Sequence, residues 1–351
     1  MTNSRSAIPR IAYVVHGKDG KHPGSAHIRI VRRARKALRD GDAWVVQLNV
    51  DEVIAGTSPA EFDAIVVQRD AIEPWKVDGF LRAVRRTKTR LVAELDDDLL
   101  TDAAVDRLVS QGYDHVRLET MKRLVKFADR VIVSTPTLAT SVREVNRSIV
   151  VVPNVVDPEL WTRPRPMLVR ESSDESLRVL YMGSWTHAGD LDLLRPVFAR
   201  FIAEGRPIAL ETVGIADHDE GWFERLDIPA GRGNYPEFVS WLMDNRHRWD
   251  IAVAPLEDTE FNAQKSDLKF LEYTMLGLPT IASDVGPYKP MAAHGLRLAR
   301  TEEDWHAALS EALGDRSVYL SQAVNAREYV EANRTLTDSH RWINAIMGRD
   351  R

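Results

Sequence analysis

The chain has 351 residues, of which 44% are hydrophobic and 28% charged, so it is long enough to form two domains with separate cores. It contains no cysteine, which excludes a disulfide-stapled secreted scaffold, and no apolar run that is long enough for a membrane-spanning helix. A net charge of −5 and the lack of a recognition motif argue against nucleic-acid binding. We therefore expect a cytoplasmic protein.

Short apolar strands alternate with helical segments through the first half of the chain. A Gly-rich loop at 17–25 and a helix at about 26–38 follow the first strand. The expected strands cover 11–16, 44–48, 64–68, 91–94, 130–134 and 149–152. This alternation predicts a parallel sheet with helices on both faces. The loop lacks the Gly-x-Gly-x-x-Gly spacing, so an NAD site is not supported.

Basic residues gather in two places of this mildly basic half. The first group, within 29–39, comprises Arg29, Arg32, Arg33, Arg35, Lys36 and Arg39. The second, within 82–90, comprises Arg82, Arg85, Arg86, Lys88 and Arg90. Such groups suit an anionic acceptor or the acidic inner face of a cell membrane. The alternative, favoured for the second group, is an ordinary solvated helix face.

Charged residues follow two of the expected strands at their carboxyl ends. Arg69 follows the strand at 65–68, and Asp96, Asp97 and Asp98 follow the strand that begins at Leu91. The aspartates have three possible roles: ligands of a divalent metal, hydrogen-bond acceptors or bases for an acceptor hydroxyl, and a cap for a helix that begins near Leu99. We expect one of the three aspartates to cap the helix, and for the other two we favour contact with the acceptor over binding of a metal ion.

The second half repeats the strand and helix pattern after a polar, Pro-rich linker. Its expected strands are 177–182, 208–213, 251–255 and 280–283. The first of them ends in Gly183 and Ser184, and a small-residue loop at such an edge lets backbone N–H groups approach phosphate closely. His187 lies within this loop, and a helix is expected from about Asp190.

The stretch 261–284 predicts a loop, a helix capped by Ser266 or Asp267 and stopped by Gly277, and a buried strand. Lys265, Lys269 and Glu272 are spaced i, i+4 and i+7, so we expect them on one face of the helix. Two ammonium groups at a helix start suit a diphosphate, and a carboxylate further along suits a ribose diol. The alternative is an exposed pair of little consequence.

This stretch resembles the donor-site signature of retaining nucleotide-sugar glycosyltransferases of the GT-B fold, in particular bacterial family 4-like members with a Phe-Asn, Lys-Ser, Leu-Lys, Leu-Glu-Tyr string. Segments 180–190, 151–161 and 129–135 agree in order. The resemblance implies an α/β fold of two Rossmann-like domains that face each other across a cleft. We expect an acceptor domain at 1–160, a linker at 161–176, a donor domain at 177–335 and a last helix, within 336–351, that crosses back.

The resemblance also implies roles for single residues. Donor phosphate and ribose would be held by Gly183, Ser184, Lys265, Ser266, Asp267, Leu268, Lys269 and Glu272, and acceptor or cleft contacts by Gly24, Ser25, His27, Arg29, Arg69 and Asp96. The catalytic candidates are His187, Asp97 and Gln264. The chain departs from the family at Gln264, because common members carry a glutamate there that contacts the donor sugar. Asn262 or Glu260 is the alternative for that role.

The implied activity is transfer of a sugar, with retention, from a nucleoside-diphosphate sugar to a hydroxyl of a glycan, a lipid-linked compound or a small molecule, in polysaccharide or glycoconjugate synthesis. The family generally needs no metal, so no cofactor is expected. Two alternatives remain: an epimerase or phosphorylase with this fold, and a non-catalytic protein that binds sugar nucleotides, for which Gln264 is the best argument.

Overall fold

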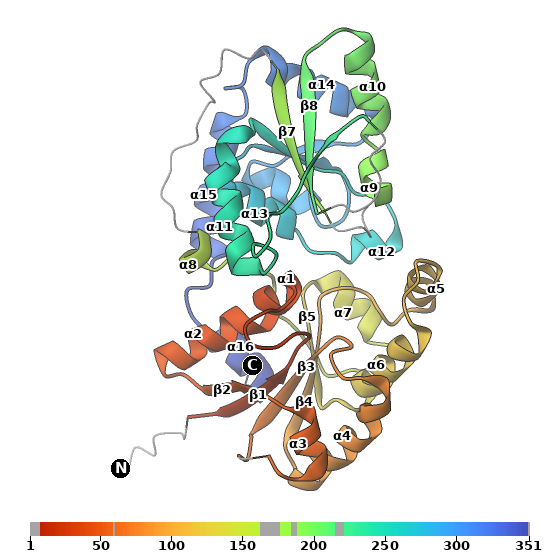
Figure 1. Cartoon of the computed structure of the whole chain (residues 1–351), viewed down its shortest axis with the longest axis vertical. Coiled ribbons are helices and arrows are strands. Elements are labelled where there is room, and N and C mark those ends of the chain that lie inside the picture. The colour runs from red at the N-terminus through yellow and green to blue at the C-terminus, as the bar shows by residue number, and fades with distance from the viewer. Residues whose placement is uncertain (1–7, 59, 162–175, 184–187, 215–220, 350–351) are drawn as a thin grey trace. The chain divides into compact units, whose positions relative to one another are not determined.

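The computed structural model describes residues 8–58, 60–161, 176–183, 188–214 and 221–349. They form two compact units, each built around its own parallel sheet (Figure 1). Unit 1 holds the residues up to Asn154, the short segment Gln264–Ser266 and the residues from Leu336 onward. Unit 2 holds Val155–Ala263 and Asp267–Thr335.

The sheet of unit 1 has six strands in the order β2-β1-β3-β4-β5-β6, and each pair is parallel. The strands are β1 (Arg10–Val14), β2 (Trp44–Gln47), β3 (Ala64–Gln68), β4 (Arg90–Leu95), β5 (Arg130–Val133) and β6 (Ile149–Val151). All six lie within one or two residues of the strands predicted from the sequence.

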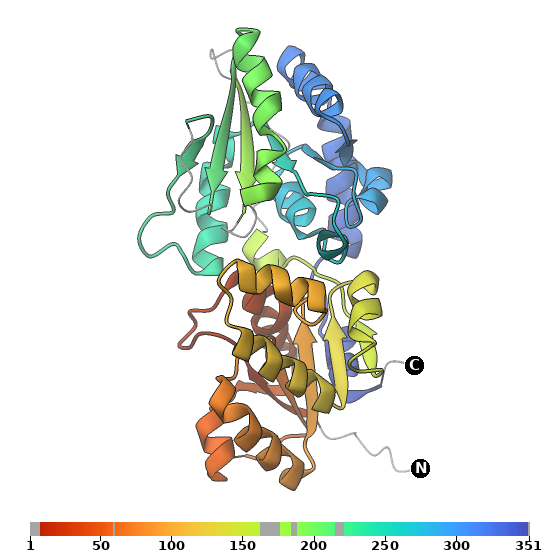
Figure 2. The same ribbon diagram turned by 90° about the vertical axis from the view of Figure 1, so that its right-hand side faces the viewer.

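Alternate strand residues of this sheet enter two different cores, because successive side chains of a strand point to opposite faces. Ala12, Ile65 and Val67 belong to one core, whereas Ile11 and Val66 belong to the other. Helices therefore cover both faces, as the sequence predicted (Figures 1 and 2).

Helices of unit 1 are α1 (Gly24–Ala26), a π-helical turn (His27–Val31), α2 (Arg32–Asp40), α3 (Val50–Ala55), α4 (Pro74–Thr87), α5 (Asp102–Ser110), α6 (His115–Phe127), α7 (Pro136–Val142) and α16 (His340–Met347). The last of these is the C-terminal helix, which packs on α2, β3 and β5. Trp342 and Ile346 of α16 are buried in the same core as Ile11. The expected return of the chain end to the N-terminal unit is thus present.

The sheet of unit 2 also has six parallel strands, in the order β12-β11-β10-β7-β8-β9. They are β7 (Leu177–Met182), β8 (Ile208–Val213), β9 (Glu224–Leu226), β10 (Ile251–Ala254), β11 (Thr280–Ser283) and β12 (Arg297–Ala299). The sequence did not predict β9 and β12. Each has only three residues, too few to show an apolar period.

Helices of unit 2 are α8 (Pro158–Trp161), α9 (Ala188–Asp192), α10 (Arg195–Ala203), α11 (Tyr235–Asn245), α12 (Glu260–Ala263), α13 (Leu268–Leu276), α14 (Glu302–Gly314) and α15 (Leu320–Asn333), with 3-10 turns at Arg246–Arg248 and Lys289–His294. Residues 155–160, expected in the first domain, lie in unit 2, where α8 packs on α11. Most of the expected linker, 162–175, falls outside the described residues.

Each sheet has a point where the chain reverses its direction of travel across the strands. In unit 1 this point lies between β1 and β3, and in unit 2 between β7 and β10. Ligands of doubly wound α/β proteins bind beyond the carboxyl ends of the strands at such a point. The observed fold therefore marks one candidate edge in each unit.

Candidate functional site

The edge of unit 2 begins at Gly183, the residue that follows β7. A Cβ atom at this position would lie 2.8 Å from the ring of Tyr181, so only glycine fits without displacing that ring. Gly214 lies beside it with φ +86°, and a Cβ there would lie 2.7 Å from the carbonyl oxygen of Gly183. Two glycines thus leave bare backbone at the edge; of these, Gly183 belongs to the loop predicted from the sequence for phosphate approach. Ser184 and His187 of the same loop lie outside the described residues.

Helix α13 brings Lys269 to the same edge. Its Nζ lies 4.8 Å from the centroid of the Tyr181 ring and 3.4 Å from the Tyr181 hydroxyl. Tyr273, also on α13, accepts a hydrogen bond from the backbone N–H of Met182 at 2.8 Å, which ties the helix to the end of β7. The position of the Lys269 ammonium group is therefore fixed by an aromatic ring and by a strand end.

Glu272 lies one turn further along α13 and is 9% exposed. The hydroxyl of Tyr235, the first residue of α11, donates a hydrogen bond of 2.7 Å to Glu272 Oε1. Burial raises the pKa of the Glu272 carboxyl to about 7, against the opposing effects of the Tyr235 hydrogen bond and the Lys269 charge. A carboxylate with this pKa gains or loses its proton near neutral pH, so its ability to accept two hydrogen bonds from a diol depends on pH.

Lys265 does not share a helix face with Lys269 and Glu272, which corrects the prediction from spacing. Helix α13 begins only at Leu268, and Lys265 lies before it in the segment that belongs to unit 1. Its Nζ lies 3.6 Å from Asp97 Oδ1. The prediction counted Lys265 as a helical residue, although the helix begins three residues later.

The two residues predicted to cap α13 make other contacts with their side chains. Asp267 occupies the N-cap position, but its side chain makes no capping hydrogen bond. Its two carboxylate oxygens instead accept hydrogen bonds of 2.7 Å each from Arg334. Ser266, the other predicted cap, accepts a hydrogen bond of 2.7 Å from Asn154 within unit 1. Leu268 is half-buried at the start of the helix.

A buried polar network lies between the ends of β7 and β10. Asp190 is 2% exposed, and its Oδ1 accepts hydrogen bonds from the Glu257 backbone N–H at 2.9 Å and from Asn262 Nδ2 at 3.1 Å. Asn262 is fully buried, and its Oδ1 makes no hydrogen bond to any described residue. This network holds the chain after β10 in place. Glu260, the other proposed substitute for the family glutamate, is exposed.

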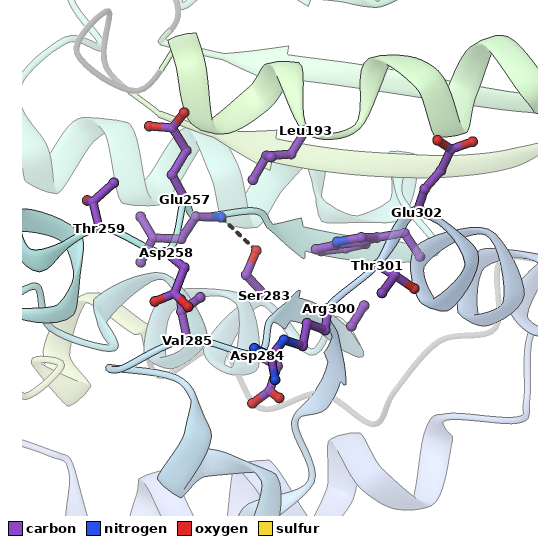
Figure 3. Close-up of a pocket in the computed structure, with 13 residues that line it drawn as sticks. Leu193, Glu257, Asp258, Thr259, Ser283, Asp284, Val285, Arg300, Thr301 and Glu302 are labelled. Carbon is purple, nitrogen blue, oxygen red and sulfur yellow. Dashed lines mark hydrogen bonds between the residues drawn. The ribbon is translucent and has the colours of Figure 1, made fainter.

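A cavity of about 470 Å³ opens at the ends of β10, β11 and β12 (Figure 3). Its lining carries four carboxylates and one guanidinium, contributed by Glu257, Asp258, Asp284, Glu302 and Arg300. The predominance of negative charge disfavours a diphosphate in this cavity. The Gly183 and Lys269 edge is therefore the better candidate for an anionic ligand.

Gln264 lies in unit 1, although the residues on both sides of its segment belong to unit 2. Its Nε2 donates a hydrogen bond of 2.9 Å to Asp98 Oδ2, and its backbone carbonyl accepts one of 2.8 Å from Thr135. Gln264 is 6% exposed. The amide in place of the family glutamate is therefore engaged by a carboxylate, which an ionised glutamate at this position would repel.

The residues expected to contact an acceptor fall into two groups in unit 1. His27 and Arg29 are fully buried in the π-helical turn. Arg29 donates hydrogen bonds to Glu94 Oε1 at 2.5 Å and to the Val152 carbonyl and Asn154 Oδ1 at 2.7 Å each. The family resemblance placed both residues at an acceptor or cleft surface. In the structure they are buried, and Arg29 forms an internal ion pair with Glu94.

The other group is more accessible. Gly24 and Ser25 of α1 are partly exposed, and the Ser25 carbonyl accepts a hydrogen bond of 3.3 Å from Gln68. Arg32 and Arg33 of the first basic group are buried as well, so that group does not form a continuous exposed face.

Arg69 and the aspartates after β4 form a charged cluster at the edge of unit 1. Arg69 Nη1 lies 3.4 Å from Asp96 Oδ1 and 3.8 Å from Asp97 Oδ2. Asp98 accepts hydrogen bonds from the backbone N–H groups of Leu100 and Thr101. The helix itself begins at Asp102 with Thr101 as its cap, which corrects the predicted aspartate cap near Leu99.

No group of three or more His, Asp or Glu side chains within the described ranges is arranged to hold a metal ion. Likewise, none of the described helices has the length and apolar character needed to cross a membrane.

Sequence reasoning missed several residues of these edges. Tyr235, Arg334 and Asp70 do not appear among the predicted site residues. Asp70 directly follows Arg69 and pairs with His16 at 3.0 Å. His16 and Asp70 each lie two residues beyond the end of a strand that flanks the reversal point, but neither occurs in a recognisable motif.

Solved glycosyltransferase structures resemble this chain over nearly its whole length. Sucrose-phosphate synthase from Thermosynechococcus elongatus is 15% identical with a TM-score of 0.69, over 97% of this chain and 98% of that chain. HepE from Anabaena, in complex with UDP and glucose, is 14% identical with a TM-score of 0.64, over 97% and 99%. A glycosyltransferase from Rickettsia africae is 12% identical with a TM-score of 0.61, over 98% and 99%.

The chain has the GT-B fold of these enzymes. Its strand orders and its returning C-terminal helix match the fold class expected from the sequence. No family model and no curated protein matches the chain.

Proposed function

We propose that the chain transfers a glycosyl group from a nucleoside-diphosphate sugar to an acceptor hydroxyl. The observation that carries this proposal is the edge of unit 2, where bare backbone at Gly183, the Lys269 ammonium group and the Glu272 carboxyl meet on and beside one helix. These groups match a diphosphate and a ribose in chemistry. The similar structure of HepE from Anabaena is in complex with UDP and glucose in one case and with UDP-glucose in another.

The proposed chemistry depends on charge that develops as the donor breaks apart. When the bond between the anomeric carbon and the diphosphate breaks, negative charge accumulates on the phosphate oxygens. A preorganised ammonium group stabilises that charge more in the transition state than in the ground state. Lys269 supplies it, with Lys265 as the second candidate, and Glu272 accepts hydrogen bonds from the ribose.

Finer points rest on the sequence resemblance. It implies a retaining hexosyltransferase of polysaccharide or glycoconjugate synthesis that needs no divalent metal. The suggestion that the chain works at the inner face of the membrane comes instead from the basic residues within 29–39, of which Arg29, Arg32 and Arg33 are buried. Gln264, Asp97 and His187 remain its catalytic candidates, with the last outside the described residues. Activity after EDTA treatment tests the metal expectation, and the anomeric configuration of the product tests retention.

The test is thermal stabilisation of the chain by a panel of UDP, GDP, dTDP, ADP and their sugars. A ligand at one hundred times its Kd adds about 2.7 kcal/mol to the free energy of unfolding. We expect one base to stand out. Lys269→Met should raise Kd by about ten- to a hundredfold, since a charge-assisted hydrogen bond contributes about 1.5–3 kcal/mol.

Lys289→Met is the matched control, because Lys289 is an exposed lysine of the same unit outside this edge. Lys265→Met measures whether the lysine before the helix also contributes. If no nucleotide stabilises the chain, or if Lys269→Met and Lys289→Met bind equally well, the donor site is misplaced. Binding without release of nucleotide in the presence of any acceptor extract would favour the non-catalytic alternative.

A further inference from the structure

Helices α4 and α6 lie side by side on one face of the sheet of unit 1 (Figures 1 and 2). Their inner side chains, such as Phe80 of α4 and Met121 of α6, enter the same core. The opposite side of each helix faces solvent, because exposed residues recur there at helical spacing. These residues are Trp75, Arg82 and Arg86 of α4 and Val116, Lys126 and Phe127 of α6, and together they are called the α4–α6 face.

Positive charge predominates on these two helices, although the whole chain has a net charge of −5. Within Pro74–Thr87 and His115–Phe127 there are eight lysine and arginine residues and only two aspartate or glutamate residues. Four of the cations pair with carboxylates of the same unit: Lys76 with Asp51, Arg117 with Glu73, Lys122 with Asp102, and Arg123 with Asp78. Their charge is therefore largely compensated.

The cations of the α4–α6 face are not compensated in this way. Arg82, Arg86 and Lys126 are exposed and form no ion pair with any residue that the structure describes. Arg82 and Arg86 belong to the second basic group of the sequence, whereas Arg29, Arg32 and Arg33 of the first group are buried. The structure thus leaves the second group, and not the first, accessible to an anionic partner.

Large apolar side chains stand between these cations. Trp75 is 76% exposed, the largest fraction among the large hydrophobic side chains of the described residues, and Val116 and Phe127 are 55% and 45% exposed. The guanidinium carbon of Arg85 lies 4.5 Å from the centroid of the Phe127 ring. Tryptophan is mostly buried in folded proteins, so its exposure beside cations indicates a surface that meets another phase or molecule.

A hollow of about 450 Å³ lies on the outer side of α6. Its lining includes Val116, Arg123 and Lys126, so it offers an apolar side chain and cations to the same ligand. Phosphate groups that carry apolar chains have this combination of properties. The hollow therefore suits the head group of an anionic lipid.

An anionic bilayer fits the α4–α6 face better than a protein partner does. The core of a protein interface is depleted of charge, whereas here each apolar side chain stands singly among cations. At a bilayer surface, aromatic rings occupy the level of the head groups and cations attract anionic lipids. Each lysine or arginine near such a surface strengthens binding by about fivefold.

We propose that the α4–α6 face binds reversibly to a bilayer that contains anionic lipids. Trp75, Val116 and Phe127 enter the layer of head groups, and Arg82, Arg86 and Lys126 lie beside lipid phosphates. The inference does not depend on the proposed function, because none of these residues is a candidate for donor or acceptor binding. It requires no membrane-spanning helix, and it predicts binding that salt weakens.

The experiment measures sedimentation of the chain with vesicles of phosphatidylcholine alone or with about one third phosphatidylglycerol, at about 0.1 M and 0.5 M salt. The wild type should bind the anionic vesicles at least tenfold more tightly than the neutral ones, and less tightly at high salt. The triple variant Arg82→Gln, Arg86→Gln, Lys126→Gln should bind them about a hundredfold more weakly.

The matched control removes the same charge from another surface of unit 1. The triple variant Lys21→Gln, Arg35→Gln, Arg39→Gln changes three exposed cations outside α4 and α6, and its binding should stay within threefold of the wild type. Thermal unfolding and nucleotide stabilisation of both triple variants should match the wild type, which shows that they are folded.

A second measurement tests insertion rather than charge. Lipids with brominated chains should quench the tryptophan fluorescence of the wild type, and Trp75→Phe should lose most of this quenching. Equal binding to neutral and anionic vesicles, or an equal loss in the two triple variants, would overturn the proposal. Binding to soluble polyglutamate but to neither kind of vesicle would also overturn it and would assign the α4–α6 face to an acidic partner instead.

Discussion

The two units share one kind of sheet but differ in the chemistry of their strand ends. In unit 1 the edge is ionic: Arg69 faces Asp96 and Asp97, and Asp70 holds His16. In unit 2 the edge is formed by glycine backbone and aromatic rings, with Lys269 above Tyr181. The same fold thus presents an ionic edge in one unit and an edge of glycine backbone and aromatic rings in the other.

Each unit also contains a fully buried glutamate, and the two are satisfied differently. Glu94 in β4 pairs with Arg29, and burial raises its pKa. Glu211 in β8 accepts hydrogen bonds from Arg178, Arg248 and Trp249. Glu94 is thus held by one internal ion pair, whereas Glu211 is held by a side chain of β7 and by two residues that precede β10.

The largest expected effect comes from breaking the buried pair of Arg29 and Glu94 in unit 1. Glu94→Ala leaves the Arg29 guanidinium buried without its carboxylate, and such a change costs about 3–5 kcal/mol of unfolding free energy. Denaturant unfolding measures it. The control is Glu331→Ala, which removes one partner of a partly exposed i,i+4 pair with Arg327 and should cost less than about 1 kcal/mol. Equal effects would mean that the Arg29 pair contributes no more than a surface pair.

The fold could be predicted from the sequence because apolar periodicity reports directly on burial. The strands at 64–68 and 251–254 consist almost wholly of apolar residues, and they form where predicted. The three-residue strands β9 and β12 were missed because their pairing depends on neighbours that are distant in sequence. Helix α13 begins and ends where predicted, with Asp267 at its N-cap and Gly277 at its C-cap, but the Asp267 side chain pairs with Arg334, a contact that local spacing cannot show.

The candidate site was predictable only in part, for the same physical reason. Gly183, Lys269 and Glu272 were found because they stand at fixed distances from strand and helix ends. His16 and Asp70 are 54 residues apart and join only through the pairing of β1 with β3. Arg29 was assigned to the cleft through the family resemblance of its loop, which could not show its buried partner Glu94, 65 residues away.

The second prediction concerns the buried Glu272 carboxyl, which lies beside the Gly183 and Lys269 edge of unit 2. Between pH 4.5 and about 7 the folded chain retains a proton on Glu272 that the unfolded chain has released, so this group lowers stability as pH rises. Glu272→Gln should therefore raise the free energy of unfolding at pH 8 by on the order of 3 kcal/mol and change it little at pH 4. Thermal unfolding without nucleotide at both pH values measures this. Glu328→Gln, at an exposed position of α15, should show no such difference.

Gly183→Ala tests whether bare backbone is needed at the same edge. The added Cβ would lie 2.8 Å from the Tyr181 ring, and relief of this clash should cost about 1–3 kcal/mol of stability. Displacement of Tyr181 should also weaken nucleotide binding, because Lys269 rests on that ring. Gly233→Ala is the control, since no atom lies within 4 Å of its added Cβ. If both variants bind nucleotide like the wild type, phosphate does not approach this backbone.

The smallest expected effect isolates one hydrogen bond of the edge. Tyr235→Phe removes the donor to Glu272 Oε1, and a neutral hydrogen bond contributes about 1 kcal/mol. The Tyr235 bond lowers the pKa of Glu272, so its loss should raise that pKa further above 7 by somewhat less than one pH unit. Because the ionised carboxylate is the form that binds a ribose diol, the pH at which nucleotide affinity reaches half its maximum should rise by the same amount. Calorimetric titration across pH 6–9 measures this shift. An unchanged midpoint would mean that Glu272 does not bind the ribose, and it would confine the anion-binding role of unit 2 to Lys269 and the glycine backbone.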